Sequence, residues 1–310
     1  MDMTKLKQRF CKDNKVPLQL FISPYFEERL KLFGFSDKWE EFLTVLEDFE
    51  SVDAYLDYYN QVKDNIIDYI KNSEAYQKLN SDDMNNYSKF KIRQSDVYKE
   101  SNIGKKFISI DMKKANFSAL VKYAKDTGTK FFDSFNYDEF MKQFTKYDYI
   151  SNSKYIRQVV FGNCNPKRQI IYESYLMSDL LHKLIDMNLV LENDIYSICS
   201  DEIVISVSDE LNVSEIKRFC DDFNEFPISF EYFTLFKLVN TQAYIKQPLN
   251  VDKNAIVVSM PILKCVNPYD APFIYRFMNN EPYQPNDCVF MFENKLAKLM
   301  ETPNITIKTR

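Results

Sequence analysis

The stretch 199-CSDEIVISVSDEL-211 contains the tripeptide Ser-Asp-Glu twice, on either side of an apolar run that is typical of a β-strand. If this run is a strand, the two copies lie roughly 26 Å apart at ~3.3 Å per residue, so they cannot share one site. The second copy, Asp209-Glu210, leads into a helix-like segment, where acids are typical of a solvated turn. The first copy, Asp201-Glu202, lies between two apolar strands, which predicts the tip of a hairpin. The first copy is therefore the candidate for chemistry.

The periodicity around this hairpin predicts an α+β fold. Apolar alternation and helical spacing predict these elements in order: a strand at 105–111, helices at 116–125 and 168–185, strands at 195–199 and 203–207, a helix at 214–223, and strands at 227–236 and 239–245. The order β-α-β-β-α-β is that of the split βαβ arrangement. Its helices cover one face of an antiparallel sheet, so we expect the other face to be free for a ligand.

We expect three regions along the chain. Residues 1–104 are predicted to be mostly helical, with aromatic stripes that are typical of a packed core, and this region is a candidate surface for a protein partner. Residues 105–247 hold the predicted sheet. Residues 248–310 are predicted to form a small α/β extension, with a strand at 255–260 and a mixed strand and helix pattern over 287–300.

Composition indicates a soluble protein of the cytoplasm. The 310 residues are 45% hydrophobic, which is ample for a globular core. Apolar runs stay below the roughly 18 residues that a bilayer span needs, so we expect no membrane partner. The first fifteen residues are too charged for a secretory signal. Six scattered cysteines without a C-x-x-C pair indicate reduced thiols.

Two scarce residue types exclude whole classes of enzyme. The chain has only four glycines, so it lacks the Gly-rich loops that cradle phosphate in Walker and Rossmann proteins. It has one histidine, His182, which excludes multi-histidine metal sites and makes a histidine-based triad a poor interpretation. Any catalysis must therefore rest on carboxylates, lysines, arginines and bound cations.

Carboxylates from distant parts of the sequence are expected to converge. The first strand ends at Asp111, and in the predicted sheet this end lies beside the Asp201-Glu202 hairpin. Adjacent carboxylates raise each other's pKa, so such a cluster is favourable chiefly around a divalent cation such as Mg²⁺ or Mn²⁺. Two ions held this way can activate a 3′-hydroxyl and stabilise a departing pyrophosphate.

Two basic stretches accompany these acids, although the net charge of the chain is −5. Residues 105–130 contain seven lysines against two aspartates, and residues 151–170 contain four basic residues and no acid. Each stretch alone is as consistent with a solvated face as with a ligand site. Together they favour a phosphate-bearing ligand.

At this point the sequence resembles the palm-domain polymerases. SIDMKKANFSALVKYA (109–124) resembles their motif A, and CSDEIVISV (199–207) resembles motif C, most closely that of family A DNA polymerases. NPKRQIIYESYLMSDLL (165–181) resembles the helix before that motif and also the motif B region of reverse transcriptases. KYIRQVVFG (154–162) is similar to the fingers helix that holds the triphosphate. The resemblance covers 105–235 and implies a compact palm, of viral or mobile-element type, with a thumb-like extension over 248–310.

The resemblance implies roles for individual residues. The metal ligands and catalytic carboxylates would be Asp111, Asp201 and Glu202. The incoming nucleoside triphosphate would meet Lys154 and Arg157, and the nucleic acid template or primer would meet Lys167, Arg168 and Gln169.

One position, five residues after the motif A aspartate, concerns the choice of sugar. Palm polymerases place there the side chain that meets the sugar 2′ position, which is Asn116 in this chain. An amide can satisfy a ribose hydroxyl and favours ribonucleotides. A shift of one residue would place Phe117 there and favour deoxyribonucleotides. Alternatively, Asn116 simply caps the helix that follows it.

Departures from the family keep other interpretations open. Ser200 stands where family A has histidine, and the fingers segment is much abbreviated. The Ser-Asp-Glu motif is also similar to that of the reverse-direction tRNA-His guanylyltransferases. A different class of protein is a palm-derived nucleic-acid-binding or structural subunit that has lost activity. A third interpretation is an α+β interaction protein whose acidic turn has no chemistry.

Overall fold

The computed structural model describes residues 3–21, 25–87, 94–253, 255–256, 261–293 and 295–310. The protein is α+β, and its largest sheet is antiparallel with the strand order β2-β3-β1-β4-β5-β6, while β9 pairs with β4. The strands of this sheet are β1 Lys106–Met112, β2 Ile195–Ile198, β3 Glu202–Ser206, β4 Ile228–Val239, β5 Tyr244–Pro248, β6 Ile262–Lys264 and β9 Thr306–Lys308. The strands are rich in isoleucine, valine and phenylalanine, whose branched or aromatic side chains favour a pleated, half-buried surface.

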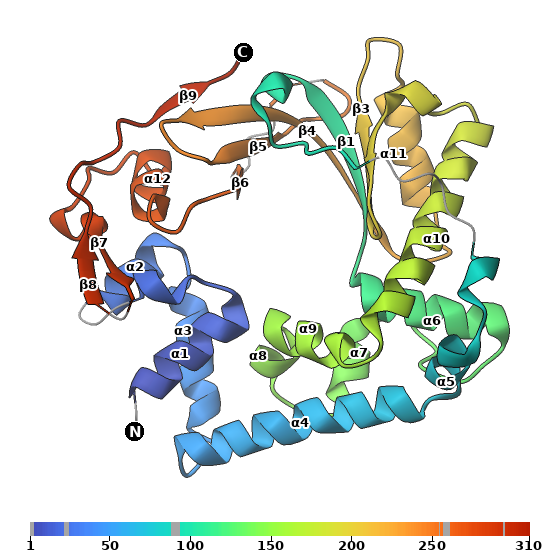
Figure 1. Cartoon of the computed structure of the whole chain (residues 1–310), viewed down its shortest axis with the longest axis horizontal. Helices are drawn as coiled ribbons and strands as arrows, with labels where there is room; N and C mark the ends of the chain where they lie inside the picture. Colours follow the sequence, from blue (N-terminus) through green and yellow to red (C-terminus); the bar gives the residue numbers. More distant parts are fainter. Residues whose placement is uncertain (1–2, 22–24, 88–93, 254, 257–260, 294) are drawn as a thin grey trace.

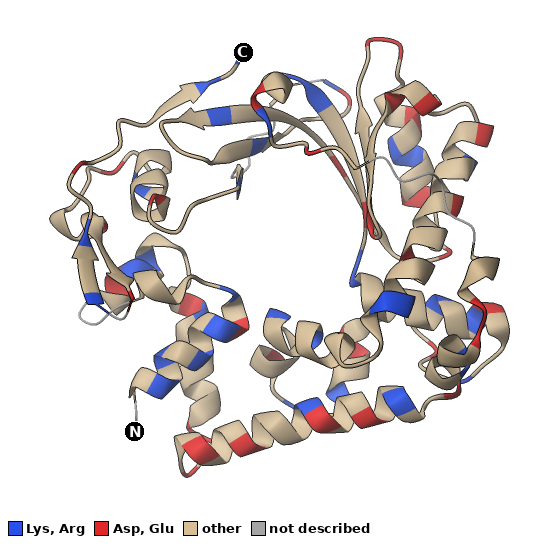
Figure 2. Cartoon of the chain, in the orientation of Figure 1, with Lys and Arg blue, Asp and Glu red and all other residues tan. Residues whose placement is uncertain are grey.

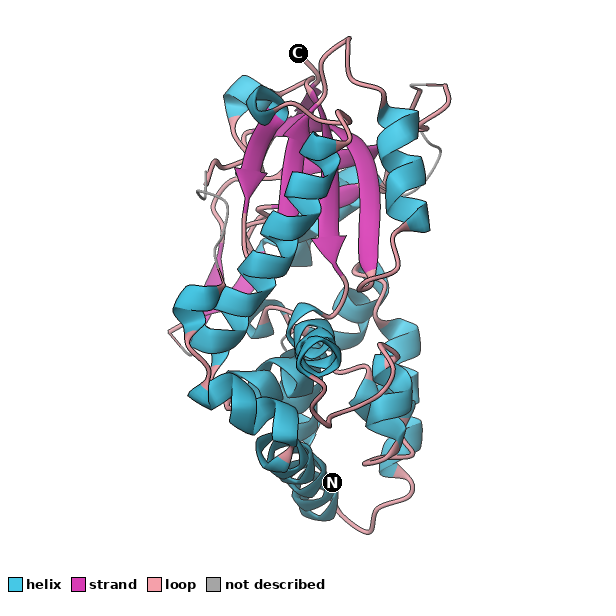
Figure 3. Ribbon diagram, turned by 90° about the vertical axis from the view of Figure 1, so that its right-hand side faces the viewer, coloured by secondary structure: helices cyan, strands magenta, loops and turns pink. Residues whose placement is uncertain are grey.

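The two faces of the sheet differ. On one face, Ile108, Ile110, Ile203 and Ile205 are buried in the main hydrophobic core. Figure 3 shows the helices lying across this face. The opposite face carries a second cluster formed by Phe107, Val204, Phe233 and Leu235. Because side chains alternate along a strand, Asp111 shares this second face with Phe107.

Helices fill the connection between β1 and β2. They are α6 Ala115–Thr127, α7 Tyr137–Lys142, α8 Asp148–Ser151, α9 Lys154–Gly162 and α10 Pro166–Asp186. Lys114 turns the chain from β1 into α6 in the left-handed conformation, with φ at 52°. Ser153 caps α9 by accepting a hydrogen bond from the Ile156 amide, and Pro166 occupies the first turn of α10, where its missing N–H costs nothing. Helix α11, Val213–Asp222, connects β3 to β4.

The N-terminal region is mostly helical, as predicted. Its helices are α1 Met3–Asn14, α2 Phe26–Leu32, α3 Ser36–Leu46, α4 Val52–Asn72 and α5 Glu74–Ser81. Aromatic side chains pack them together: the ring of Phe10 lies 5.0 Å from that of Trp39 and 6.0 Å from that of Phe42. None of the helices in the described ranges is both long and apolar enough to cross a bilayer.

The C-terminal region closes a ring of elements against α2 (Figure 1). It contains α12 Ala271–Met278 and the hairpin of β7 Val289–Phe292 and β8 Lys295–Lys298. The Arg276 guanidinium on α12 donates to Glu28 on α2 at 2.7 Å and to Asp287 at 2.6 Å. Arg29, only 1% exposed, donates from α2 to the backbone carbonyls of Asn286 and Val289.

Two predicted elements need correction. Residues 239–245 are not one strand: β4 runs to Val239, Asn240 turns the chain with φ at 63°, and β5 starts at Tyr244. The mixed strand and helix pattern over 287–300 is the β7–β8 hairpin, in which residues 289–292 pair with residues 295–298. A third element, the predicted strand at 255–260, lies largely outside the described residues; of its described part, Ile256 forms a single bridge with Leu249.

Candidate functional site

The pairing of β1 with β3 gathers three acidic residues at one end of the sheet. Asp111 and Glu202 are direct cross-strand partners. The Met112 amide donates to the Asp201 carbonyl at 2.8 Å, and the Cys199 amide donates to the Glu202 carbonyl at 2.8 Å, which closes the turn between β2 and β3. The structure therefore brings together the segments of Asp111, Asp201 and Glu202, as the sequence predicts.

The surroundings of the Asp111 carboxyl disfavour its ionised form. Burial, followed by the charges of Asp201, Glu202 and Glu231, raises its pKa to about 6, and the nearby Lys246 opposes this shift. Partial burial and three like charges all disfavour the ionised carboxylate. Each of these costs falls when a cation binds, so the electrostatics of this end of the sheet favour a cation.

Glu202 departs from its expected position. It is the first residue of β3 and not the tip of the hairpin, because its pairing with Asp111 extends the strand by one residue. Its carboxylate accepts a hydrogen bond of 2.5 Å from the Ser109 hydroxyl on β1. Within the described ranges, His, Cys, Asp and Glu side chains do not form a group of three or more that could hold a metal ion.

Asn116 is paired with a carboxylate that sequence reasoning missed. Its amide nitrogen donates to Glu173 on α10 at 2.5 Å, and Glu173 is only 2% exposed. Burial raises the pKa of Glu173 to about 7; the Asn116 amide opposes this shift and the charge of Asp201 adds to it. One sequence signal points to Glu173: it is an acid on the same helix stripe as the buried Leu176.

The structure separates the interpretations of Asn116 and Phe117. Asn116 is not a helix cap, because α6 begins at Ala115 and the cap position belongs to Lys114. Phe117 is fully buried, with its ring 5.1 Å from that of Phe140. The cap interpretation is therefore wrong, and Phe117 is part of the core.

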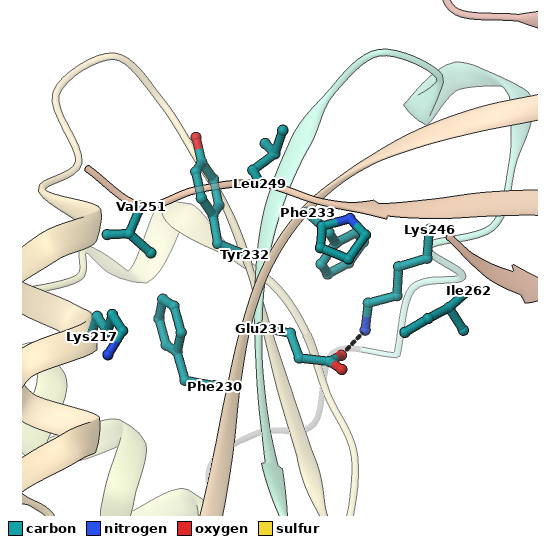
Figure 4. Close-up of a pocket in the computed structure, with 10 residues that line it drawn as sticks. Lys217, Phe230, Glu231, Tyr232, Phe233, Lys246, Leu249, Val251 and Ile262 are labelled. Carbon is teal, nitrogen blue, oxygen red and sulfur yellow. Dashed lines mark hydrogen bonds and ion pairs between the residues drawn. The ribbon is translucent and has the colours of Figure 1, made fainter. Parts of the chain in front are cut away.

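A second acid–base pair lies on the same face of the sheet (Figure 4). Glu231 on β4 sits opposite Ser109 and forms an ion pair with Lys246 on β5. Lys246 is 4% exposed, and its ammonium lies 4.3 Å from the centroid of the Phe233 ring. A cavity of about 260 Å³ opens beside this pair. Lys246 therefore supplies a positive charge that acts on Asp111.

The predicted triphosphate ligands lie on α9 and act on the start of α6. Lys154 is exposed at the first turn of α9, and Arg157 is half-buried one turn later. Burial lowers the pKa of Lys114, and the charges of Arg157 and Lys154 lower it further against the opposing Asp138. Lys154 and Arg157 thus act on Lys114, which lies three residues along the chain from Asp111.

The predicted nucleic-acid ligands at the start of α10 have different environments. Lys167 is exposed. The Arg168 guanidinium donates to the backbone carbonyls of Leu79 and Asp82, each at 2.8 Å. Gln169 is 1% exposed, and its amide nitrogen donates to the Cys164 carbonyl at 2.6 Å. Arg168 and Gln169 hold α10 to its neighbours here, and a nucleic-acid contact by them stays a prediction.

The second Ser-Asp-Glu copy lies apart from these residues. Asp209 and Glu210 are exposed in the turn that follows β3, and Asn212 caps α11 immediately after them by accepting from the Glu215 amide. Strand β3 runs from one copy to the other, so the copies lie at its opposite ends. The expected separation of the two motifs is present in the fold.

Comparisons with protein-family models, with curated proteins and with solved structures find no match to the chain.

Proposed function

We propose that the chain is a palm-domain nucleotidyltransferase that adds nucleotides to the 3′ end of a nucleic acid. The observation that carries this proposal is the cross-strand pairing of Asp111 with Glu202, next to the bond between the Met112 amide and the Asp201 carbonyl. These contacts bring the motif A-like and motif C-like segments to one end of a sheet. Nucleotidyl transfer needs acidic ligands for cations at such a place.

The connectivity of the sheet supports a palm. The four central strands follow the spatial order β2-β3-β1-β4, and helices connect β1 to β2 and β3 to β4. This order and these connections support the proposal of a β-α-β-β-α-β palm, the split βαβ arrangement. It leaves the face with Asp111 and Glu231 free of the helices that pack on Ile108 and Ile110.

A divalent cation fits the raised pKa of Asp111, because the cation replaces carboxylate repulsion with attraction. Asp111 and Asp201 would hold it, and Glu202 would reach it once its bond to Ser109 is exchanged. Bound Mg²⁺ would supply Lewis-acid activation of the 3′-hydroxyl and neutralise charge on the phosphates. The Lys246 ammonium forms an ion pair with Glu231, and its positive charge offsets part of the repulsion between Glu231 and Asp111.

The cations of α9 and α6 suit the triphosphate. In the reaction, the 3′-oxygen bonds to the α-phosphorus, the bond to the bridging oxygen breaks, and the hydroxyl proton is lost as pyrophosphate leaves. Lys154, Arg157 and Lys114 would hold the β- and γ-phosphates and stabilise the charge that builds up there.

The Asn116–Glu173 pair supports a ribonucleotide substrate. Because the amide nitrogen of Asn116 is bound to Glu173, its carbonyl oxygen is the atom left to accept a hydrogen bond from a ribose 2′-hydroxyl. Competition between matched ribo- and deoxyribonucleoside triphosphates tests this role. Asn116→Ala should reduce the preference for ribonucleotides about tenfold, since one hydrogen bond is lost. A preference for deoxyribonucleotides that Asn116→Ala leaves unchanged would contradict it.

The proposed reaction is tested by extension of a labelled primer on a template with Mg²⁺ or Mn²⁺ and all nucleoside triphosphates. The expected result is extension by the wild-type chain and none by Asp111→Asn. The absence of extension on RNA and DNA templates with either ion would overturn the proposal.

An inactive palm-derived binding subunit is the second candidate. The observation that favours it is the bond of Glu202 to Ser109, in a structure whose described residues hold no group of three metal-binding side chains. Thermal unfolding separates the two candidates. A catalytic site predicts that Mg²⁺ with a nucleoside triphosphate raises the melting temperature, and that Asp111→Asn removes this effect. Stabilisation by nucleic acid alone would favour the binding subunit.

A further inference from the structure

Helix α1 presents cations to a tyrosine of α9. The Arg9 guanidinium, the Lys12 ammonium and the Lys15 ammonium lie 4.8, 4.7 and 5.4 Å from the centroid of the Tyr155 ring. Arg9 also lies over the ring of Tyr59 at 3.8 Å, so its guanidinium is held between two tyrosines. Figure 2 shows Lys and Arg on both α1 and α9.

A buried carboxylate fixes α1 against α9. Asp13, only 2% exposed, accepts hydrogen bonds from Arg9, from the Tyr59 hydroxyl at 2.9 Å and from the Ser153 hydroxyl at 3.2 Å. Ser153 is also the residue that caps α9. Since Lys12 precedes Asp13 and Lys154 follows Ser153, this contact brings the backbones of the two lysines close together.

The cations of this surface are not balanced by acids. In the part of the chain that the structure describes, no carboxylate forms an ion pair with Lys12, Lys15, Lys154 or Arg157. Asp13, which follows Lys12 in the chain, is buried and bound to Arg9. Cations that gather without counter-charges create a positive potential, which attracts an anion with several charges.

We propose that this surface, formed by Lys12, Lys15 and Tyr155 and called the α1–α9 basic surface, binds the backbone of a single-stranded nucleic acid. The inference rests on the proposed function, in which the strand is the template. Lys12 on α1 and Lys15 just after it belong to a different segment from Lys154 and Arg157, the residues proposed to hold the triphosphate. Cations interleaved with an aromatic ring are typical of surfaces that bind single strands with little regard to sequence.

The path of the strand follows from the order of the cations. The α1–α9 basic surface ends at Tyr155 on α9, and Arg157 on the same helix acts on Lys114 at the start of α6. Lys114 is three residues from Asp111. The α1–α9 basic surface therefore leads a bound strand to the acidic end of the sheet, and this gives the N-terminal helices a role in holding the template.

The test is the binding of fluorescein-labelled single-stranded RNA and DNA of about 12 nucleotides, measured by anisotropy without nucleotides or divalent ions. Lys12→Glu should weaken binding about fivefold to tenfold at ~0.1 M salt. It should also reduce the slope of log affinity against log salt concentration by about one unit, because about one phosphate contact is lost. The matched control is Lys253→Glu, an equal charge change at an exposed lysine after β5, an element drawn well away from α1 and α9 in Figure 1. The control should bind as the wild type does.

Equal losses from Lys12→Glu and Lys253→Glu would overturn the proposal, because only the overall charge would then matter. An unchanged affinity for Lys12→Glu would overturn it as well. A wild-type chain that binds through Lys12 yet extends no primer would overturn the proposed function and leave this surface standing.

Discussion

Asp201 and Asp209 occupy identical tripeptides, yet the fold gives them opposite surroundings. Asp201 lies beside Asp111, whereas Asp209 is exposed at the far end of β3. Asp201→Asn should lower the rate of nucleotide incorporation at least about a thousandfold, because a ligand of the catalytic cation is lost. Asp209→Asn, an identical chemical change in the same strand–turn region, should leave the rate within about twofold. Single-turnover primer extension measures both rates, and similar losses would contradict the assignment.

Glu173 predicts a pH dependence of stability. Burial raises its pKa from the ordinary 4.5 to about 7. Because the folded pKa is higher than the unfolded one, the group favours the fold when protonated, and this contribution is lost as pH rises from about 4.5 to 7. The loss is on the order of 3 kcal/mol for this group.

The test is urea unfolding of the protein with EDTA across this pH range. Glu173→Gln keeps a neutral side chain in the same space and should remove the decline in the free energy of unfolding between about pH 6 and 7, because the contribution of Asp111 is lost at lower pH, up to about 6. The control is Glu210→Gln, which changes an exposed acid. It should leave the decline unchanged, and an equally steep decline in Glu173→Gln would show that Glu173 is not its source.

Single residues also show where sequence reasoning ends. Asp111 and Asp201 were predictable, because each acid interrupts an apolar strand pattern at a place where strands end. Glu173 was not predicted, since its burial depends on the packing of α10 on α6, a tertiary contact that no local pattern contains. Arg168 and Gln169 belong to a motif-like run, but their backbone partners lie in other segments that the run does not specify.

Helix α9 is the element whose role depends most on charge. Arg157→Ala should raise the KM for the nucleoside triphosphate about tenfold, since a guanidinium that binds phosphate acts in both the ground state and the transition state. Gln158→Ala changes the next residue, which is exposed on the same helix, and should leave KM unchanged. Steady-state extension kinetics give both values. If Arg157→Ala and Lys154→Ala both keep the wild-type KM, α9 is a solvated helix face.

Elements with strong periodicity were predicted within about two residues, and elements set by turns were not. The helix expected at 168–185 is α10, Pro166–Asp186, because its apolar stripe is long and regular. The break between β4 and β5 depends on the left-handed backbone of Asn240. A single polar residue in an apolar run does not predict that conformation. In the same way, the short continuous apolar run at 289–292 could not separate a strand from a helix.

Arg276 joins the two ends of the ring. Its side chain is 9% exposed and binds Glu28, Glu281 and Asp287, whose own side chain is 1% exposed. Arg276→Ala should lower the free energy of unfolding by about 3–5 kcal/mol, because the buried Asp287 carboxylate loses its cation. Lys183→Ala, which removes two exposed ion pairs, should cost at most about 1 kcal/mol. Urea unfolding measures the loss in the free energy of unfolding for both variants. Equal losses would show that Arg276 does not stabilise the contact between α12 and α2.

The hydrogen bonds of Arg29 have a consequence for how the protein is made. They join Arg29 to Asn286 and Val289, which lie 257 and 260 positions further along the chain. Closing so long a loop costs chain entropy, and contacts of this separation slow folding. On the ribosome, the N-terminal helices therefore emerge long before their C-terminal partners exist, with the Arg29 guanidinium and the apolar surface around it uncovered. We expect the nascent chain to need protection by a chaperone until Val289 has left the exit tunnel.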